Sequence, residues 1–251
     1  MKNLFLFDVD GTITESGQKI EDNIVKILNK IKDNSNNELG IVGGGKLDKI
    51  LYQLDNKIIF DHYFTECGCI YYKNFTKNDI SLSNIYTKNI RDHALFYQFN
   101  KLIKICLNYL SNVEYNLSGT FIDLRSGLIY VSLIGMQANN IERNYFINID
   151  NKDKIRKKLL IILNNYLIDN NLHDKIVACE GGTVGIALYP YEWDKIQVLD
   201  KIDMNNYENI YYFGDKYLEN GNDYKIINSN LVNGYKINNI NDTINYLNEL
   251  I

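Results

Sequence analysis

The chain has 251 residues, and 45% of them are hydrophobic, so it can bury one large core or two smaller ones. Its formal net charge of -4 argues against a general nucleic-acid binder, because affinity for a phosphate backbone requires a basic face. The longest apolar stretches are far shorter than the roughly 20 residues that cross a bilayer, and no signal-peptide pattern is present. These features predict a cytosolic protein with no nucleic-acid or membrane partner.

The first predicted strand ends in two acidic residues. The apolar residues 4–6 are followed directly by FDVDGT, residues 7–12. Side chains two apart on an extended segment point to the same side, so Asp8 and Asp10 can share one small volume, while Gly11 allows a tight turn. Such a pair suits a magnesium ion, and it suits chemistry in which one carboxylate attacks phosphorus while the other moves a proton. The alternative interpretation is an ordinary Asp-Gly loop after a strand.

The next segment predicts a helix, a strand, a glycine loop and a second helix. Apolar residues recur at helical spacing over residues 20–31, and a polar break precedes the apolar residues 39–42. The glycine triplet of residues 43–45 comes next, before an amphipathic helix over residues 47–54. This order places a second loop at the edge of the sheet where phosphate would bind.

From about residue 80 the pattern changes to that of a separate α+β unit. Its predicted elements are a helix at 102–110, a hairpin of 120–124 and 128–133, a long helix at 155–167, and strands at 176–179 and 184–189. The strands are expected to form an antiparallel sheet.

The last segment returns to the first unit. Residues 209–213 predict a strand that ends in Gly214 and Asp215, and residues 240–251 predict a closing amphipathic helix. We therefore expect an α/β core with a parallel sheet, formed by residues 1–80 and 190–251. An inserted α+β cap of residues 81–189 interrupts this core.

The acid at the end of the last strand completes a predicted metal site. Because the carboxyl ends of parallel strands meet at one edge, Asp215 is expected near Asp8 and Asp10. Magnesium prefers oxygen ligands, so we expect it to bind the Asp8 carboxylate, the backbone carbonyl of Asp10 and Asp215, with water and a substrate phosphate completing the octahedron. The alternative is that Asp215 only caps a helix.

These motifs together resemble a known family. FDVDGT after an apolar strand resembles the first motif of the haloacid dehalogenase (HAD) superfamily. With VGGG from Val42, GTFIDLRSG from Gly119, YPYEWDK from Tyr189 and YFGDKYLENGND from Tyr212, the chain resembles the eukaryotic-type phosphomannomutase family over nearly its whole length. The resemblance implies a HAD-like Rossmannoid core and an α+β cap, often dimeric through the cap. It also implies interconversion of mannose 6-phosphate and mannose 1-phosphate with Mg²⁺ and a hexose 1,6-bisphosphate activator.

The resemblance also implies roles for single residues of the core. Asp8 would be the nucleophile that becomes an aspartyl phosphate, and Asp10 would be the acid and base that serves the sugar oxygen. Thr12 would orient that pair. Lys195 would neutralise the phosphoryl group and Asp8, although position alone would make it a solvated lysine.

Further roles concern the metal and the phosphate. Asp223 would join Asp215 as a metal ligand. Backbone amides of Gly44 and Gly45 would cradle the transferring phosphate, and Arg125 would bind substrate on the cap.

Five positions depart from the family pattern. Gly45 stands where a phosphate-binding serine is usual, Ser118 and Met136 where arginines grip the second phosphate, and Gly185 and Ala187 where a serine and an aspartate contact substrate. Loss of charge-assisted contacts weakens the grip that a mutase needs to hold its bisphosphate in both orientations. The alternatives are therefore a magnesium-dependent phosphatase of a small phosphorylated metabolite, and a binding protein that has lost useful turnover.

Overall fold

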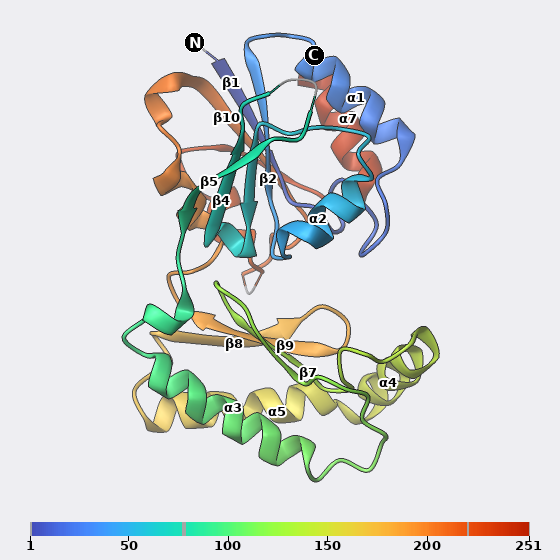
Figure 1. The fold of residues 1–251 in the computed structure, drawn as a ribbon, viewed down its shortest axis with the longest axis vertical. Coiled ribbons are helices and arrows are strands. Elements are labelled where there is room, and N and C mark those ends of the chain that lie inside the picture. The colour runs from blue at the N-terminus through green and yellow to red at the C-terminus, as the bar shows by residue number, and fades with distance from the viewer. Residues whose placement is uncertain (1, 77–78, 220, 251) are drawn as a thin grey trace. The chain divides into compact units, whose positions relative to one another are not determined.

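The computed structural model describes residues 2–76, 79–219 and 221–250. The chain divides into two compact units, a larger one of residues 1–87 and 193–251 and a smaller one of residues 88–192. Figure 1 shows both units. The smaller unit is inserted between two segments of the larger one, so the polypeptide leaves the larger unit after Thr87 and re-enters it at Trp193.

The larger unit is built on a seven-stranded sheet with the order β11-β10-β1-β2-β3-β4-β5. Its strands are β1 (Lys2–Phe7), β2 (Asn37–Val42), β3 (His62–Thr65), β4 (Ile70–Asn74), β5 (Leu82–Thr87), β10 (Tyr207–Gly214) and β11 (Asn233–Lys236). The pairs from β11 to β3 are parallel, whereas β4 and β5 are antiparallel to their neighbours. The predicted parallel sheet is confirmed.

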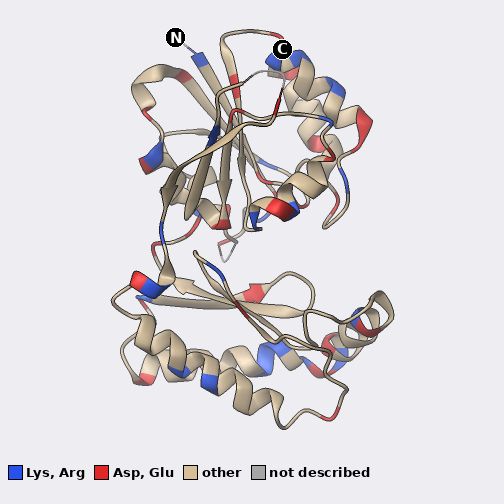
Figure 2. Ribbon diagram, viewed as in Figure 1, with Lys and Arg blue, Asp and Glu red and all other residues tan. Residues whose placement is uncertain are grey.

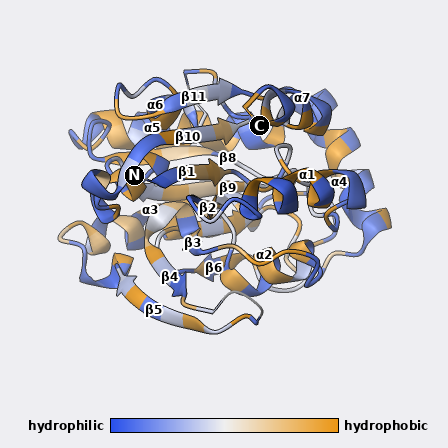
Figure 3. Ribbon diagram, turned by 90° about the horizontal axis from the view of Figure 1, so that it is seen from above, coloured by the Kyte–Doolittle hydropathy of each residue, from blue (hydrophilic) through white to orange (hydrophobic). Residues whose placement is uncertain are grey.

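Alternation along β1 explains why the larger sheet is covered on both faces. Phe5 and Phe7 enter one apolar cluster, which contains buried residues of α1 (Asp22–Lys32), α2 (Leu47–Leu54) and α7 (Ile240–Leu250). The intervening Leu4 and Leu6 enter the other cluster. Because neighbouring strand residues point to opposite faces, a continuously apolar strand requires cover on both sides. In Figure 3, α1 and α7 carry hydrophobic and hydrophilic stripes, as expected for helices lying on a sheet.

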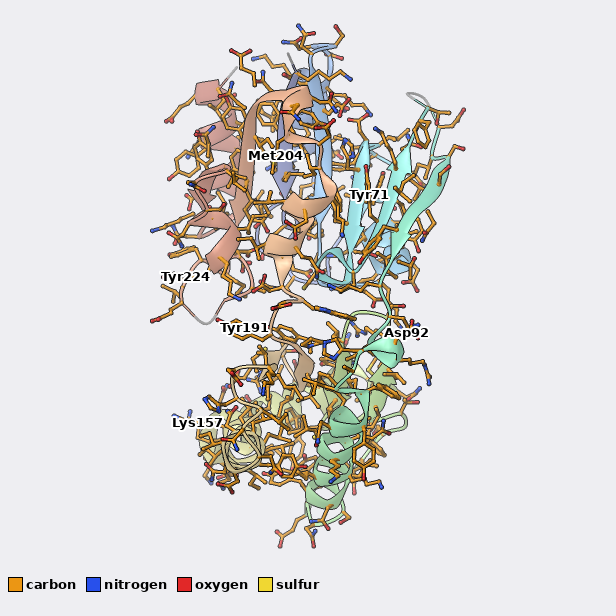
Figure 4. The ribbon with its side chains drawn as sticks, turned by 90° about the vertical axis from the view of Figure 1, so that its left-hand side faces the viewer. Tyr71, Asp92, Lys157, Tyr191, Met204 and Tyr224 are labelled. Carbon is orange, nitrogen blue, oxygen red and sulfur yellow. The ribbon has the colours of Figure 1, made fainter. Side chains whose placement is uncertain are left out.

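The second cluster lies under short helical segments. These are η3 (Lys195–Lys201), η4 (Met204–Asn206) and α6 (Tyr224–Ile227). Figure 4 labels Tyr71 on β4, which belongs to the cluster, and Met204 on η4, which packs against it. A further short segment, η1 (Glu66–Gly68), joins β3 to β4.

Four strands of the larger sheet, β3, β4, β5 and β11, were not predicted, and β5 changes a boundary. Residues 82–87, which the sequence analysis assigned to the cap, form β5 and pair with β4. At the other end, Tyr191 donates its backbone N–H to Lys175 and belongs to the smaller unit. Both differences arise from backbone pairing between segments that carry no boundary signal in the sequence. The predicted last helix ends at Leu250, and Ile251 lies outside the described residues.

The smaller unit is an antiparallel sheet with the order β6-β7-β9-β8 and three long helices. Its strands are β6 (Ile122–Leu124), β7 (Ile129–Ser132), β8 (Ile176–Gly181) and β9 (Gly185–Pro190), and its helices are α3 (Phe96–Leu110), α4 (Asn140–Asp153) and α5 (Ile155–Asp169), with the turn η2 (Ile90–Asp92). The predicted antiparallel sheet is confirmed. Helix α4 was missed, although Asn139 and Glu142 form a capping box that marks its start.

The helices leave one face of the smaller sheet uncovered within this unit. Buried Ile129 and Val131 of β7 alternate with the partly exposed Tyr130, which lies opposite Ala187 of β9. Helices α3 and α5 run along the other face (Figure 1). Figure 2 shows acidic and basic residues interspersed over the loops and helices of both units. Among residues 2–76, 79–219 and 221–250, no helix combines the length and apolar character of a membrane span.

The packing of Tyr130 on Gly185 gives a stability prediction. A Cβ at position 185 would lie 2.4 Å from Tyr130 Cζ, so Gly185→Ala overpacks this site. We expect a loss of about 1–3 kcal/mol in the free energy of unfolding, measured by urea denaturation. In a Tyr130→Ala background the same change is expected to cost less, because only the approach of the Cβ to the Val131 carbonyl oxygen, at 2.6 Å, remains. Equal losses in the two backgrounds would contradict the contact.

Candidate active site

Asp8 and Asp215 come together because β1 and β10 are parallel neighbours. Phe7 pairs with Phe213, so the residues that follow both strands emerge at one edge of the sheet. There Gly11, in the left-handed region at φ +84°, turns the chain away, and a Cβ on it would lie 2.6 Å from Asp215 Oδ2. Glycine is therefore required twice at this turn, for its backbone conformation and for the space that Asp215 occupies.

Asp8, Asp215 and Asp223 form a compact acidic cluster. One carboxylate oxygen from each lies within 4.8 Å of the others. Asp215 Oδ1 is buried and, among the described residues, has no hydrogen-bond partner. A buried carboxylate oxygen without a partner is costly unless a cation binds it. The oxygen-only donor set and this free atom fit Mg²⁺. The Asp10 carbonyl remains a predicted ligand.

Lys195 lies in the same cluster and is 1% exposed. Its Nζ is 2.6 Å from Asp8 Oδ1 and 2.7 Å from Asp223 Oδ1. Burial alone favours the neutral amine, but the two carboxylates raise the pKa of Lys195 well above its ordinary value, so it carries a full charge. The interpretation of Lys195 as a solvated surface lysine is wrong.

The nucleophile candidate has an altered pKa of its own. Burial raises the pKa of Asp8 to about 7, the charges of Asp223 and Asp215 act in the same direction, and Lys195 opposes them. Asp223 is held further by Tyr212, whose hydroxyl donates to Oδ1 at 2.5 Å, and by the backbone N–H of Lys216, which donates to Oδ2 at 2.9 Å. Tyr212 opens the motif YFGDKYLENGND, but the sequence analysis assigned it no role, because it is one aromatic residue within an apolar strand.

Asp10 lies outside this cluster and faces α2. Lys49 Nζ donates to its Oδ2 at 2.6 Å, while the Gly17 N–H and Gln53 Nε2 donate to its Oδ1 at 2.7 and 2.8 Å. Burial opposes ionisation, but the hydrogen bonds from Lys49 and Gly17 prevail and lower the pKa of Asp10. Lys49 and Gln53 were missed, although a spacing of four residues on a helix places both on one face.

The structure places Thr12 differently from its predicted role. The side chain is fully buried, and its hydroxyl makes no hydrogen bond with any described residue. Its backbone oxygen instead accepts a bond of 2.7 Å from the hydroxyl of Thr243 on α7. Thr12 therefore joins the turn to the last helix, and no described contact supports its orienting Asp8 or Asp10.

Two backbone hydrogen bonds join the glycine loop after β2 to η1. The N–H groups of Glu66 and Cys67 donate to the carbonyls of Gly45 and Gly43, at 3.1 and 2.9 Å. Among the described residues, the N–H groups of Gly44 and Gly45 have no acceptor. A pair of free backbone donors suits a phosphate, and phosphate binding by Gly44 and Gly45 remains a prediction.

Arg125 lies in the smaller unit, in the turn between β6 and β7. Its Nε donates to Asp123 at 2.7 Å, and its guanidinium carbon lies 5.1 Å from the ring centroid of Tyr130. These two contacts hold Arg125 beside the uncovered face of the sheet. Binding of substrate by Arg125 remains a prediction.

Comparison with known proteins gives a consistent result. The profile of the family described as eukaryotic phosphomannomutase matches residues 24–251. Phosphomannomutase of Encephalitozoon cuniculi is 34% identical over 96% of this chain and 91% of its own length. The Saccharomyces cerevisiae enzyme is 33% identical over 99% and 94%, and human phosphomannomutase 1 is 31% identical over 98% and 91%.

Solved structures support the fold. A C-terminally truncated Plasmodium falciparum IMP-nucleotidase superposes with a TM-score of 0.66 at 16% identity, covering 99% of this chain and 71% of that one. The C-terminal domain of Candida albicans trehalose-6-phosphate phosphatase gives 0.55 at 16% identity, covering 99% and 75%. The expected HAD-like α/β fold is therefore confirmed.

The raised pKa of Asp8 predicts that metal binding depends on pH. A proton and Mg²⁺ compete for this carboxylate, so affinity falls as the pH drops below about 7. We expect Mg²⁺ to bind about tenfold more tightly at pH 8 than at pH 6, measured by titration calorimetry. Asp215→Asn is expected to remove binding at both values. Equal affinity at the two pH values, or normal binding by the variant, would contradict this site.

Proposed function

This chain belongs to the eukaryotic phosphomannomutase family, and from that premise we propose that it interconverts mannose 6-phosphate and mannose 1-phosphate through an aspartyl phosphate on Asp8. The single observation that supports this best is the arrangement of the Asp8 carboxylate. Lys195 holds Oδ1, whereas Oδ2 makes no hydrogen bond with any described residue. One oxygen is thereby fixed and the other remains available as a nucleophile.

The first transfer follows from this geometry. Asp8 Oδ2 forms a bond to phosphorus as the bond between phosphorus and the oxygen of the donor breaks. Lys195 stays within 2.6 Å of the other oxygen and offsets the negative charge that gathers at the site. A bound Mg²⁺ would be held by Asp8, Asp215 and Asp223, and it would supply electrostatic stabilisation of the phosphoryl oxygens.

Asp10 serves the sugar oxygen in both directions. When a sugar hydroxyl attacks the phosphoaspartate, Asp10 removes its proton, and in the reverse direction it returns the proton to the leaving oxygen. Three donors already hold this carboxylate, and a carboxylate offers about four acceptor sites, so one remains for the hydroxyl. The low pKa keeps Asp10 ionised and ready as the base.

A phosphatase is the second candidate function, because the cap has few free phosphate ligands. Ser118, which stands where an arginine is usual, donates its hydroxyl to Glu142 at 2.7 Å. Gly185 and Ala187 offer no side-chain donor. Hydrolysis requires only water in place of the sugar hydroxyl, and Asp10 would activate it. The hypothesis of a binding protein without turnover is less well supported, since Asp8, Lys195 and the acidic cluster are all in place.

Other properties expected from the sequence accompany this proposal. They are activation by a hexose 1,6-bisphosphate, a homodimer formed through the cap, and a cytosolic location. Each remains a prediction.

The decisive test follows both reactions in one tube. Purified protein receives mannose 1-phosphate, Mg²⁺ and glucose 1,6-bisphosphate, and mannose 6-phosphate and free phosphate are measured together. We expect sugar isomerisation to exceed phosphate release, and Asp8→Asn to lower it by at least about a thousandfold, because the attacking group is lost. Asp22→Asn, which alters an exposed acid of α1, is the matched control.

Each outcome of this test has a clear meaning. Phosphate release without isomerisation would establish the phosphatase. If neither product forms at any activator concentration, the result would support the hypothesis of a binding protein without turnover. Turnover that survives Asp8→Asn would reject the covalent mechanism.

The contact between Lys49 and Asp10 predicts a change in the pH profile. Lys49→Met removes the donor and the charge that lower the pKa of Asp10, whereas burial, which raises it, remains. Because the base must be ionised, the acidic limb of the plot of kcat against pH is expected to move to higher pH. Lys57→Met, which removes a lysine paired with Asp22, should leave the limb in place. Superimposable profiles for Lys49→Met and wild type would rule out this role.

A further inference from the structure

Tyr130 occupies the centre of the uncovered face of the smaller sheet. On β7 it lies between Ile129 and Val131, whose side chains are fully buried. Its cross-strand neighbours are Asp123 on β6 and Ala187 on β9. Since strand residues alternate between faces, the Tyr130 ring lies on the side away from the buried residues of β7.

Small residues on β8 and β9 make room for this ring. A Cβ at Gly185 would lie 2.4 Å from both Tyr130 Cζ and the hydroxyl oxygen, and one at Gly181 would lie 3.1 Å from Cε2. Ala187, directly opposite in the pairing, adds only a methyl group. The tyrosine therefore fills the space that larger side chains at positions 185 and 187 would need.

Three arginines place positive charge near enough to affect the phenol. Arg125 lies over the ring at 5.1 Å. The positive charges of Arg125, Arg143 and Arg156 oppose the effect of burial, which nevertheless raises the pKa of Tyr130. The phenol thus stays protonated at neutral pH and is a hydrogen-bond donor. Among the described residues its hydroxyl has no hydrogen-bond partner, and it is not one of the fully enclosed polar atoms.

The arginines differ in how their charge is compensated. Arg125 is paired with Asp123, and Arg156 with both Asp150 and Glu180. Arg143 donates only to the backbone carbonyls of Ala138 and Met136, at 3.0 and 3.3 Å. No carboxylate among the described residues lies within ion-pair distance of it. Its charge remains available to an anion, beside a free phenol donor.

We propose that Tyr130 is the specificity-determining residue of the cap, and that its hydroxyl donates a hydrogen bond to the non-reacting phosphate of a sugar bisphosphate. The proposal rests on the proposed function, because only a mutase must hold a second phosphate. A neutral phenol can donate to a phosphate oxygen, and the charge of Arg143 favours a dianion there. Tyr130 takes over a function that the glycine and alanine opposite it cannot provide.

The test separates the hydroxyl from the ring. Tyr130→Phe keeps the packing on Gly185 and removes only the donor, and Tyr166→Phe on α5 is the matched control, since its hydroxyl reaches Gln98 on α3. Binding of glucose 1,6-bisphosphate is measured by calorimetry in the Asp8→Asn background, which prevents turnover. Acetyl phosphate, which has one phosphate and no sugar, is assayed as a substrate with Asp8 intact.

Tyr130→Phe is expected to weaken bisphosphate binding by about tenfold or more, as for a lost hydrogen bond to a charged group. Turnover of acetyl phosphate and the melting temperature should match those of the control. Unchanged bisphosphate affinity would overturn the proposal, and so would equal losses with both ligands, which would indicate a structural role. If the wild type does not consume acetyl phosphate, the proposed phosphotransfer function is rejected. The bisphosphate affinities of Tyr130→Phe and its control still test the role of Tyr130.

Discussion

The buried ammonium of Lys195 is the interaction on which the candidate site depends. It lies within 2.7 Å of Asp8 and Asp223, in a place where Asp215 adds a third carboxylate. Buried acids this close cannot all ionise without a positive charge among them. The members come from three separate parts of the chain, since Asp215 and Asp223 share the segment between β10 and α6. Lys195 lies two residues after the chain re-enters the larger unit at Trp193, far in sequence from the Asp8 that it contacts.

The two acids of the first motif differ because their surroundings differ. Asp8 faces other carboxylates in a buried space, and its pKa rises to about 7. Asp10 faces Lys49, Gln53 and a backbone N–H, and its pKa falls. Opposite shifts in neighbouring acids are a physical basis for assigning different roles. In the proposed function, the first carboxylate would bind phosphorus and a metal ion, and the second would exchange a proton with the sugar.

The smaller unit shows how small residues on one strand make room for a large side chain on its neighbour. Gly185 and Ala187 remove side chains from one strand, and Tyr130 on the neighbouring strand fills the space. In the sequence, Gly185 and Ala187 look like the loss of two substrate-contacting side chains, because each is compared only with the residue that the family has at that position. In the structure, the hydroxyl of Tyr130 occupies the space beside Gly185. Because the interior is closely packed, a large ring at position 130 requires a residue without a Cβ at position 185.

The sequence by itself determined the α/β core, the antiparallel sheet of the cap and the meeting of Asp8 with Asp215. These follow from local periodicity and from the rule that parallel strands end at one edge, which needs no knowledge of packing. Only the tertiary structure decided that Lys195 is buried, that Asp10 faces α2, that residues 82–87 belong to the larger sheet, and that Tyr130 covers Gly185. The physical reason is that these facts depend on contacts between segments far apart in the chain. No local pattern encodes which distant side chain will occupy a given volume.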